Sequence, residues 1–363
     1  MVNIKEHYMR LALQLALKAK GKTFPNPLVG AIVVKDRRIV GRGFHAKAGF
    51  PHAEIIALQE AGAKAQGSTL YVTLEPCVHF GRTPPCVDSI IASKVKEVVI
   101  GMIDPNPLNN GRGVAFLKQR KINVTVGVLE NESRTINEVF IKYITKKMPL
   151  VTVKVAQSLD GKIATFAGDA KWITSDASRA YAHRLRAHFD AIMVGVNTVL
   201  RDDPSLDAWF SEKHPIKIIV DSHLSTPATA RIFAGQRSVI IVTLAMQPGQ
   251  ETQNRKALES KARILEVKEE CGQINLKDML KKLAKQGIGT LLVEGGGTLV
   301  GSLVDKKLVD KFMFFMSPKI IGGKDALSPV MGKGIVRMDQ ALRLRDIKLK
   351  RIAEDFLIEG NVG

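Results

Sequence analysis

The chain has 363 residues and a 45% hydrophobic composition, enough for two cores, and no apolar run approaches the roughly 18 residues of a membrane-spanning helix. Its formal net charge of +19 is spread over both halves, since residues 1–147 hold 22 Lys and Arg against 11 Asp and Glu, and residues 148–363 hold 32 against 24. With only 6% aromatic residues to stack on bases, this basic chain suits phosphorylated small molecules better than nucleic acid.

The first half of the chain alternates between helical and strand patterns. Helices are expected over residues 4–20, 53–65, 87–93, 113–119 and 133–145, and strands over residues 29–34, 38–44, 69–74, 97–101 and 122–129. This alternation predicts an α/β domain over residues 1–146, with a central sheet covered on both faces. Residues 146–149 are expected to form a linker, because Pro149 ends the last helical pattern.

The alternation starts again after the linker. Strands are expected over residues 150–156, 191–195, 216–221, 238–243, 290–294 and 311–316, with further short strands near the C-terminus. Helices are expected over residues 178–188, 276–286 and 298–306. The pattern predicts a second α/β domain over residues 150–363.

The N-terminal segment and the cysteine content both indicate the cellular compartment of the protein. Residues 1–20 carry charges throughout, which makes them a poor signal peptide. The chain has only three cysteines, as suits a reducing compartment. We therefore expect a cytoplasmic protein without membrane association.

The most informative motif of the first half combines His52 and Glu54 with Cys77 and Cys86. One imidazole and two thiolates can hold zinc with a fourth position open, where a bound water ionises near neutral pH. The pattern is typical of zinc nucleobase deaminases, in which the glutamate carries protons. It departs from their usual spacing, since eight residues separate the cysteines here instead of two.

Two other interpretations of this motif are open. The cysteines could be buried apolar residues and His52 a surface histidine, or the site could be a closed structural one with His79 as the fourth ligand. Against the first, a proline precedes each cysteine and stiffens the backbone there. Cys86 also opens an apolar periodic stretch, which would place its thiolate at a helix N-terminus.

The second half has a glycine-rich turn, Val293-Glu-Gly-Gly-Gly-Thr298, between a predicted strand and a predicted helix. Such a turn lets a ligand approach the backbone and offers helix N-terminal N–H groups to a phosphate. A tight connection without a ligand is the alternative. Lys154, on the first strand of this half, could help protonate a carbonyl oxygen, although a plain surface lysine fits the sequence nearly as well.

Several longer segments resemble one enzyme family. The segments are Pro25-Asn-Pro-Leu-Val-Gly30, Pro76-Cys-Val-His-Phe-Gly-Arg-Thr-Pro-Pro-Cys86, Val155-Ala-Gln-Ser-Leu-Asp-Gly161, Lys171-Trp-Ile-Thr-Ser175 and Val194-Gly-Val-Asn-Thr-Val-Leu-Arg-Asp-Asp-Pro204. Together they are similar to the bifunctional deaminase–reductases of riboflavin biosynthesis over nearly the whole chain. The resemblance implies an N-terminal cytidine-deaminase-like three-layer domain and a C-terminal α/β domain like dihydrofolate reductase.

The same resemblance implies two reactions. Residues 1–146 would use zinc, with Glu54 as proton carrier, to remove the 2-amino group of 2,5-diamino-6-(5-phosphoribosylamino)pyrimidin-4-one by hydrolysis. Residues 150–363 would then use NADPH to reduce the ribosyl group to a ribityl chain. The partners would be this phosphorylated pyrimidine and further copies of the chain in a homo-oligomer, with no nucleic acid.

The resemblance also assigns residues to each ligand. The metal ligands would be His52, Cys77 and Cys86. NADPH would contact Ala156, Trp172, Thr198, Asp202, Ser222, Gly296, Gly297, Thr298, Leu299, Val300, Gly301 and Ser302. The reductase substrate would contact Arg186, Leu206 and Glu294, and the candidates for the deaminase substrate are Asn26, His45, His79 and Arg82.

Two residues depart from the family pattern. Ala170 stands where a serine is usual, and Trp209 stands where an arginine is usual. The second change removes a cation expected to contact the substrate, which puts the affinity of the reductase in question.

Two other functions fit parts of the sequence. The chain could be a nucleic-acid deaminase whose second domain binds RNA, with a steep dependence of RNA affinity on salt. Alternatively, residues 150–363 could form a non-catalytic oligomerisation domain, which would bind no cofactor.

Overall fold

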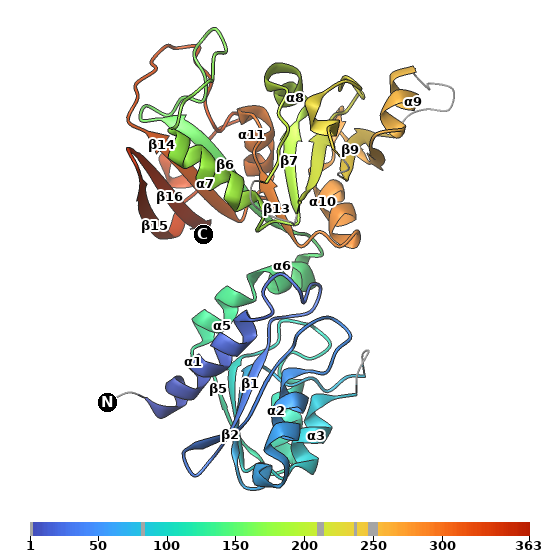
Figure 1. Ribbon diagram of the computed structural model, residues 1–363, viewed down its shortest axis with the longest axis vertical. Helices are drawn as coiled ribbons and strands as arrows, with labels where there is room; N and C mark the ends of the chain where they lie inside the picture. Colours follow the sequence, from blue (N-terminus) through green and yellow to red (C-terminus); the bar gives the residue numbers. More distant parts are fainter. Residues whose placement is uncertain (1–2, 81–83, 209–213, 236–237, 246–252) are drawn as a thin grey trace. The chain divides into compact units, whose positions relative to one another are not determined.

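The computed structural model describes residues 3–80, 84–208, 214–235, 238–245 and 253–363 (Figure 1). The chain divides into two compact units, unit 1 from Met1 to Lys147 and unit 2 from Met148 to Gly363. No helix in these described ranges combines the length and the apolar character needed to cross a membrane.

Unit 1 is built around a five-stranded sheet with the order β2-β1-β3-β4-β5. β1 is antiparallel to β2 and β3, whereas β3, β4 and β5 are parallel. The strands are β1 (Gly30–Lys35), β2 (Arg38–Phe44), β3 (Thr69–Leu74), β4 (Glu97–Met102) and β5 (Asn123–Val126). The helices are α1 (Ile4–Leu17), α2 (Ala53–Ala61), α3 (Cys86–Ala92), α4 (Arg112–Gln119), α5 (Glu130–Ile136) and α6 (Glu138–Lys146), with a 3-10 turn at Gly62–Ala65.

Helices cover both faces of this sheet, because apolar side chains of β1 point alternately to one face and the other. Ala31 and Val33 pack into the core shared with α2, α3 and α4, whereas Ile32 and Val34 pack against α1. Two glycines on β2 bring α2 close, and a Cβ at Gly43 would lie 2.1 Å from the carbonyl oxygen of Ala53, the first residue of α2. This contact fixes the N-terminus of α2, where His52 and Glu54 lie.

Unit 2 contains a nine-stranded sheet with the order β10-β9-β8-β7-β13-β6-β14-β16-β15. Its strands are β6 (Leu150–Ser158), β7 (Ala191–Gly195), β8 (Ile216–Val220), β9 (Val239–Leu244), β10 (Arg263–Val267), β13 (Thr290–Val293), β14 (Lys311–Ser317), β15 (Leu344–Ile352) and β16 (Asp355–Val362), and a separate ribbon pairs β11 (Glu269–Glu270) with β12 (Gln273–Ile274). The helices are α7 (Asp176–Arg186), α8 (Val196–Asp202), α9 (Gln253–Glu259), α10 (Leu276–Lys285) and α11 (Gly297–Asp305), with 3-10 turns at Arg231–Phe233 and Met338–Gln340.

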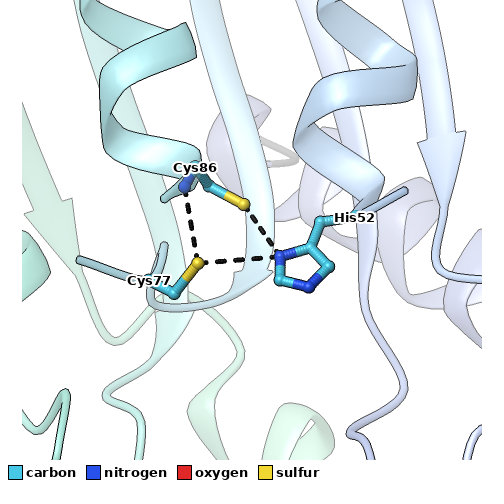
Figure 2. A group of neighbouring side chains, drawn as sticks. All are labelled: His52, Cys77 and Cys86. Carbon is cyan, nitrogen blue, oxygen red and sulfur yellow. Dashed lines mark hydrogen bonds between the residues drawn. The ribbon is translucent and has the colours of Figure 1, made fainter. Parts of the chain in front are cut away.

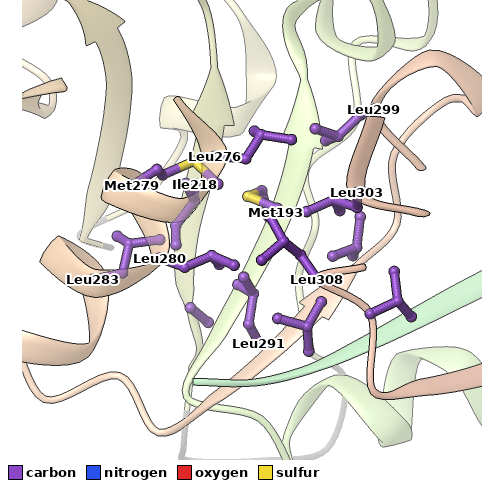
Figure 3. Close-up of a cluster of buried hydrophobic side chains, with 14 of the residues drawn as sticks. Met193, Ile218, Leu276, Met279, Leu280, Leu283, Leu291, Leu299, Leu303 and Leu308 are labelled. Carbon is purple, nitrogen blue, oxygen red and sulfur yellow. The ribbon is translucent and has the colours of Figure 1, made fainter. Parts of the chain in front are cut away.

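The largest core of unit 2 lies between the sheet and helices α10 and α11 (Figure 3). Met193 of β7, Leu291 of β13 and Leu280 of α10 are among its fully buried members. β13 lies between β6 and β7 with both pairings parallel, so that Val293 is opposite Val153 on one side and Met193 on the other. The carboxyl ends of these three strands therefore meet at one edge, where ligands bind in open α/β sheets.

The predicted mixed α/β organisation is confirmed, but several boundaries differ. The helix predicted over residues 133–145 is two helices, because the buried Asn137 amide bonds the backbone of Leu28 and Ser133 at the break. The helix predicted over residues 53–65 ends at Ala61, since Gly62 adopts a φ of 52°. The C-terminal strands predicted to be short span nine and eight residues, and α8, α9, β10, β11 and β12 were not predicted.

Candidate active sites

Three metal-type donors converge in unit 1 (Figure 2). His52 is the N-cap residue of α2, Cys77 follows the end of β3, and Cys86 is the first residue of α3. His52 Nδ1 lies 2.9 Å from Cys86 Sγ and 3.6 Å from Cys77 Sγ, and all donor atoms lie within 4.8 Å of one another. Such separations match a tetrahedral zinc site with sulfur and nitrogen ligands.

The electrostatics of this cluster suit a cation. A hydrogen bond from the Cys86 thiol lowers the pKa of Cys77 to about 4, whereas that bond and burial raise the pKa of Cys86. The Cys86 backbone N–H also donates to Cys77 Sγ over 3.4 Å. His79 does not belong to the cluster in the described residues, which leaves three protein donors and an open fourth position.

Glu54 lies beside the three donors without joining them. It sits in the first turn of α2, and its side chain is buried. Burial raises the pKa of Glu54 above its usual value, because a buried carboxyl loses the water that stabilises its charged form.

A second buried carboxylate, Glu75, holds the loops around the cluster. It accepts backbone hydrogen bonds from Asp104 at 3.1 Å, Gly111 at 2.9 Å and Val114 at 3.0 Å. Since Gly111 is the N-cap of α4 and offers no side chain, Glu75 takes the role of the missing cap. The segment leading from β3 to Cys77 is thereby tied to the segment that follows β4.

A cavity of about 310 Å³ opens onto His52, Glu54 and Cys77. Three of the predicted substrate contacts, Asn26, His45 and His79, line it. His45 is bonded on both ring nitrogens, to Asn26 at 3.0 Å and to the Pro51 carbonyl at 3.2 Å. His79 Nδ1 is buried without a hydrogen-bond partner among the described residues, as expected of a group that awaits a ligand. The fourth candidate, Arg82, lies outside the described residues.

The cavity also contains polar residues that sequence reasoning missed. Asp104 and Asn106 follow β4 and line the wall of the cavity. Burial raises the pKa of Asp104 to about 6. Their place directly after a buried strand, in the segment Asp104-Pro-Asn-Pro107, was the available signal.

In unit 2, a cavity of about 300 Å³ is lined by residues of β6, by α8, which follows β7, and by the segment directly after β13. Of the predicted cofactor contacts, Ala156, Trp172, Thr198, Asp202 and Gly296 line it. Of the predicted substrate contacts, Arg186 and Glu294 line it. Arg179, which was not predicted, places its guanidinium 4.5 Å from the centroid of the Trp172 ring.

A buried network of charges forms one wall of this cavity. Arg186 forks onto Glu294 with N–O distances of 2.7 and 2.9 Å, and Lys154 Nζ lies 3.5 Å from the same carboxylate. Burial alone would raise the pKa of Glu294, but the charges of Arg186 and Lys154 outweigh it and hold that pKa well below its usual range. Glu294 is therefore a fixed anion between two cations.

A second cavity, of about 240 Å³, adjoins the first, since Thr198 and Gly296 line both. It is lined by four more of the predicted cofactor contacts, Ser222, Thr298, Leu299 and Ser302. Gly296 donates its N–H to Thr198 Oγ1 over 3.2 Å and caps α11, whose first turn points at the boundary between the two cavities. The two cavities together offer an elongated site along α11 for a dinucleotide.

Four predicted contacts do not line either cavity. Val300 is fully buried in the core, and Leu206 is packed with Ile192 and Ile219. Gly297 and Gly301 face the segment after β14, since a Cβ at Gly297 would lie 2.3 Å from the Ser328 carbonyl oxygen and one at Gly301 would lie 0.8 Å from that of Met331. Both glycines leave room for this internal contact. The sequence had suggested close approach of a ligand at Gly297, and the resemblance had named Gly301 as a cofactor contact.

Of the two residues that depart from the family pattern, the structure describes one. Ala170 lines the first cavity of unit 2, so a missing hydroxyl there changes the surface that a ligand meets. Trp209 lies outside the described residues.

Comparison with known proteins agrees with both sites. Residues 2–102 match the cytidine and deoxycytidylate deaminase zinc-binding region, and residues 149–358 match the RibD C-terminal domain. The riboflavin biosynthesis protein RibD of Aquifex aeolicus is 47% identical over 98% of both chains, and that of Escherichia coli is 37% identical over 97% of this chain and 98% of the other.

Solved structures show the same two-part organisation. The diaminohydroxyphosphoribosylaminopyrimidine deaminase/5-amino-6-(5-phosphoribosylamino)uracil reductase of Thermotoga maritima superimposes with a TM-score of 0.80 at 36% identity, covering 99% of both chains. Acinetobacter baumannii RibD gives a TM-score of 0.82 at 34% identity, also over 99% of both chains. With a zinc-type site in unit 1 and a cofactor-type site in unit 2, the chain belongs to the RibD family of bifunctional deaminase–reductases of riboflavin biosynthesis.

Proposed function

We propose that the chain carries out two successive steps of riboflavin biosynthesis, one in each unit. Unit 1 removes the 2-amino group of 2,5-diamino-6-(5-phosphoribosylamino)pyrimidin-4-one by hydrolysis, and unit 2 reduces the ribosyl group of the product to ribityl with NADPH. The observation that carries this proposal is the convergence of the donor atoms of His52, Cys77 and Cys86 beside a cavity that the buried Glu54 also lines.

In unit 1, His52, Cys77 and Cys86 would hold zinc, and their donor set fits that ion. The bound ion would supply an activated water near neutral pH. Glu54 would take one proton from that water and deliver it to the ring nitrogen as the hydroxyl adds to the ring carbon. It would then carry the proton of the added hydroxyl to the amine, which leaves as ammonia. The side chains of Asn26, His45 and His79, with Asp104 and Asn106, would orient the pyrimidine.

In unit 2, NADPH would lie along the two adjoining cavities. The first turn of α11, with Gly296 and Thr298, would receive its phosphates, and Trp172, Thr198 and Asp202 would lie near the nicotinamide half. The bound cofactor would supply hydride to the ribose carbon. Arg186 would bind the ribosyl phosphate, and Glu294 would accept hydrogen bonds from sugar hydroxyls. Lys154 would donate its proton to the ribose ring oxygen that leaves as hydride adds, in place of a carbonyl oxygen.

We also propose that the protein is a cytoplasmic homo-oligomer that does not bind nucleic acid. β15 is the outermost strand of its sheet, and Ile347 and Leu349 on it are 62% and 67% exposed. An uncovered edge strand with apolar side chains suits pairing with another copy of the chain. Light scattering of the purified protein tests this: an oligomer is expected, and a monomer at micromolar concentration would contradict it.

Incubation of the purified protein with the diaminopyrimidine phosphate, followed by mass spectrometry, tests the proposed activities. Without NADPH we expect the deaminated product and ammonia, and with NADPH the deaminated and reduced product. Tight binding to RNA without conversion of the pyrimidine would favour the nucleic-acid deaminase, and deamination without any binding of NADPH would favour a non-catalytic second unit.

A further inference from the structure

Unit 2 contains a buried lysine outside both cavities. Lys217 lies on β8 between Ile216 and Ile218, and only 1% of its side chain is exposed. Its Nζ donates a hydrogen bond to the Ile232 carbonyl oxygen over 3.0 Å. Burial, and then the charge of Arg186, lower the pKa of Lys217 to about 8. A buried charge of this kind is retained only where it is paired.

The carboxylate that faces this ammonium belongs to Asp207. Lys217 Nζ lies 3.1 Å from Asp207 Oδ1. Asp207 directly follows Leu206, whose backbone is in the left-handed region with a φ of 52° and whose side chain is buried. Because a leucine in that conformation is costly, the turn needs contacts that hold it in place. The ion pair with Lys217 is such a contact.

The Leu206–Asp207 turn also contacts the charged wall of the reductase cavity. The Asp207 carbonyl oxygen accepts a hydrogen bond from Arg186 Nη1 at 2.9 Å, and His183 Nδ1 lies at the same distance from it. The other nitrogens of Arg186 fork onto Glu294. A continuous chain of polar contacts therefore runs from Lys217 through Asp207 to Arg186 and Glu294.

We propose that Lys217 is a positioning residue for the reductase substrate. Its ammonium fixes the Leu206–Asp207 turn, and the Asp207 carbonyl then holds the guanidinium of Arg186 in the orientation that binds the ribosyl phosphate. The inference rests on the proposed function of Arg186 and Glu294. This role explains why a lysine occupies a position of β8 whose neighbours are apolar. The Lys217 ammonium orients the Arg186 guanidinium through Asp207, without contacting it.

Three variants test this inference. Lys217→Met keeps the length of the side chain and removes the charge, Lys217→Arg keeps the charge, and Lys277→Met removes an exposed lysine of α10 as a matched control. The measurements are KM and kcat for reduction of the deaminated intermediate, binding of that intermediate by calorimetry without cofactor, and the melting temperature. Deamination by unit 1 serves as an internal control for folding.

We expect Lys217→Met to weaken intermediate binding and to raise KM about tenfold to a hundredfold, with kcat changed less than about threefold. Lys217→Arg should recover most of the affinity, and Lys277→Met should match the wild type. Asp207→Asn should weaken binding as well, and its effect should not add to that of Lys217→Met in the double variant.

Two results would overturn the inference. If Lys217→Met lowered the melting temperature but left the affinity for the intermediate unchanged, Lys217 would be structural only. Additive effects of the Lys217 and Asp207 variants would lead to the same conclusion. If the wild-type protein itself deaminated the substrate but did not bind the intermediate, the proposed reductase function would fail first, and the inference would fall with it.

Discussion

Glu54 lines the cavity of unit 1 and Glu294 lines the first cavity of unit 2, and the two carboxyls are held in opposite ways. Glu54 in unit 1 has burial as the main influence on its pKa, which is raised. The Glu294 side chain in unit 2 is also largely buried but lies between Arg186 and Lys154, and its pKa is lowered. Burial therefore does not decide the charge of a carboxyl; its partners do. The first arrangement suits a group that moves protons, and the second suits a fixed anion that orients a ligand.

The largest effect is expected from removing a zinc donor. In Cys86→Ser, a hydroxyl replaces the buried thiol group whose sulfur lies 2.9 Å from His52 Nδ1, so the protein should lose its metal and its deaminase activity together. Elemental analysis measures the zinc. Cys271→Ser, at an exposed cysteine, is the matched control and should retain both. Full zinc occupancy in Cys86→Ser would remove this residue from the ligand set.

Loss of the proton carrier should come next. Glu54→Gln keeps the shape of the side chain but cannot exchange protons, so deamination should fall by about 10²–10⁴-fold while the zinc content stays unchanged. The rate of ammonia release measures the effect. A variant that retained more than about a tenth of the activity would place the proton transfer on another group.

A packing change in unit 2 should have a smaller effect. In Gly301→Ala, the new Cβ would lie 0.8 Å from the Met331 carbonyl oxygen, so α11 and the segment around Met331 must move apart. We expect a loss of about 1–3 kcal/mol in the free energy of unfolding of unit 2 and weaker NADPH binding. Denaturant unfolding and cofactor fluorescence measure these quantities. An unchanged stability would mean that the segment around Met331 is not packed on α11.

The smallest effect concerns the histidine beside Arg186. Burial, and then the charge of Arg186, lower the pKa of His183 to about 4, so the ring should stay neutral between pH 5 and 8. Imidazole NMR signals, assigned by comparison with His183→Gln, report this titration. A midpoint near the ordinary value of about 6.5 would show that the wall around Arg186 is open to water.

The sequence predicted unit 1 more completely than unit 2. His52, Glu54, Cys77 and Cys86 stand in two compact motifs, and strand and helix ends bring them together much as their spacing indicated. The buried acceptor Glu75 was not recognised, because it acts on backbone N–H groups between residues 104 and 114, and backbone contacts leave no residue pattern.

In unit 2 the sequence identified several residues of the cavities but not the distant segments that other residues contact. Gly297 was interpreted as room for a ligand, and the resemblance placed Gly301 among the cofactor contacts. The neighbour of both is a segment about thirty residues further along the chain, which periodicity cannot reveal. Lys217 was passed over inside an apolar strand, since its partner Asp207 comes from a turn whose path depends on tertiary structure. Local sequence patterns do not predict contacts between segments that lie far apart in the chain.

The central claim is that one chain contains two independent sites, each depending on its own buried glutamate. Mass spectrometry of the products formed by Glu54→Gln and by Glu294→Gln tests it most directly. Glu54→Gln should reduce added deaminated intermediate with NADPH but leave the diaminopyrimidine unchanged, whereas Glu294→Gln should deaminate normally and accumulate the unreduced intermediate. Mixed together, the two variants should form the final product. Loss of both activities in Glu54→Gln, while it remains folded and zinc-loaded, would contradict the account.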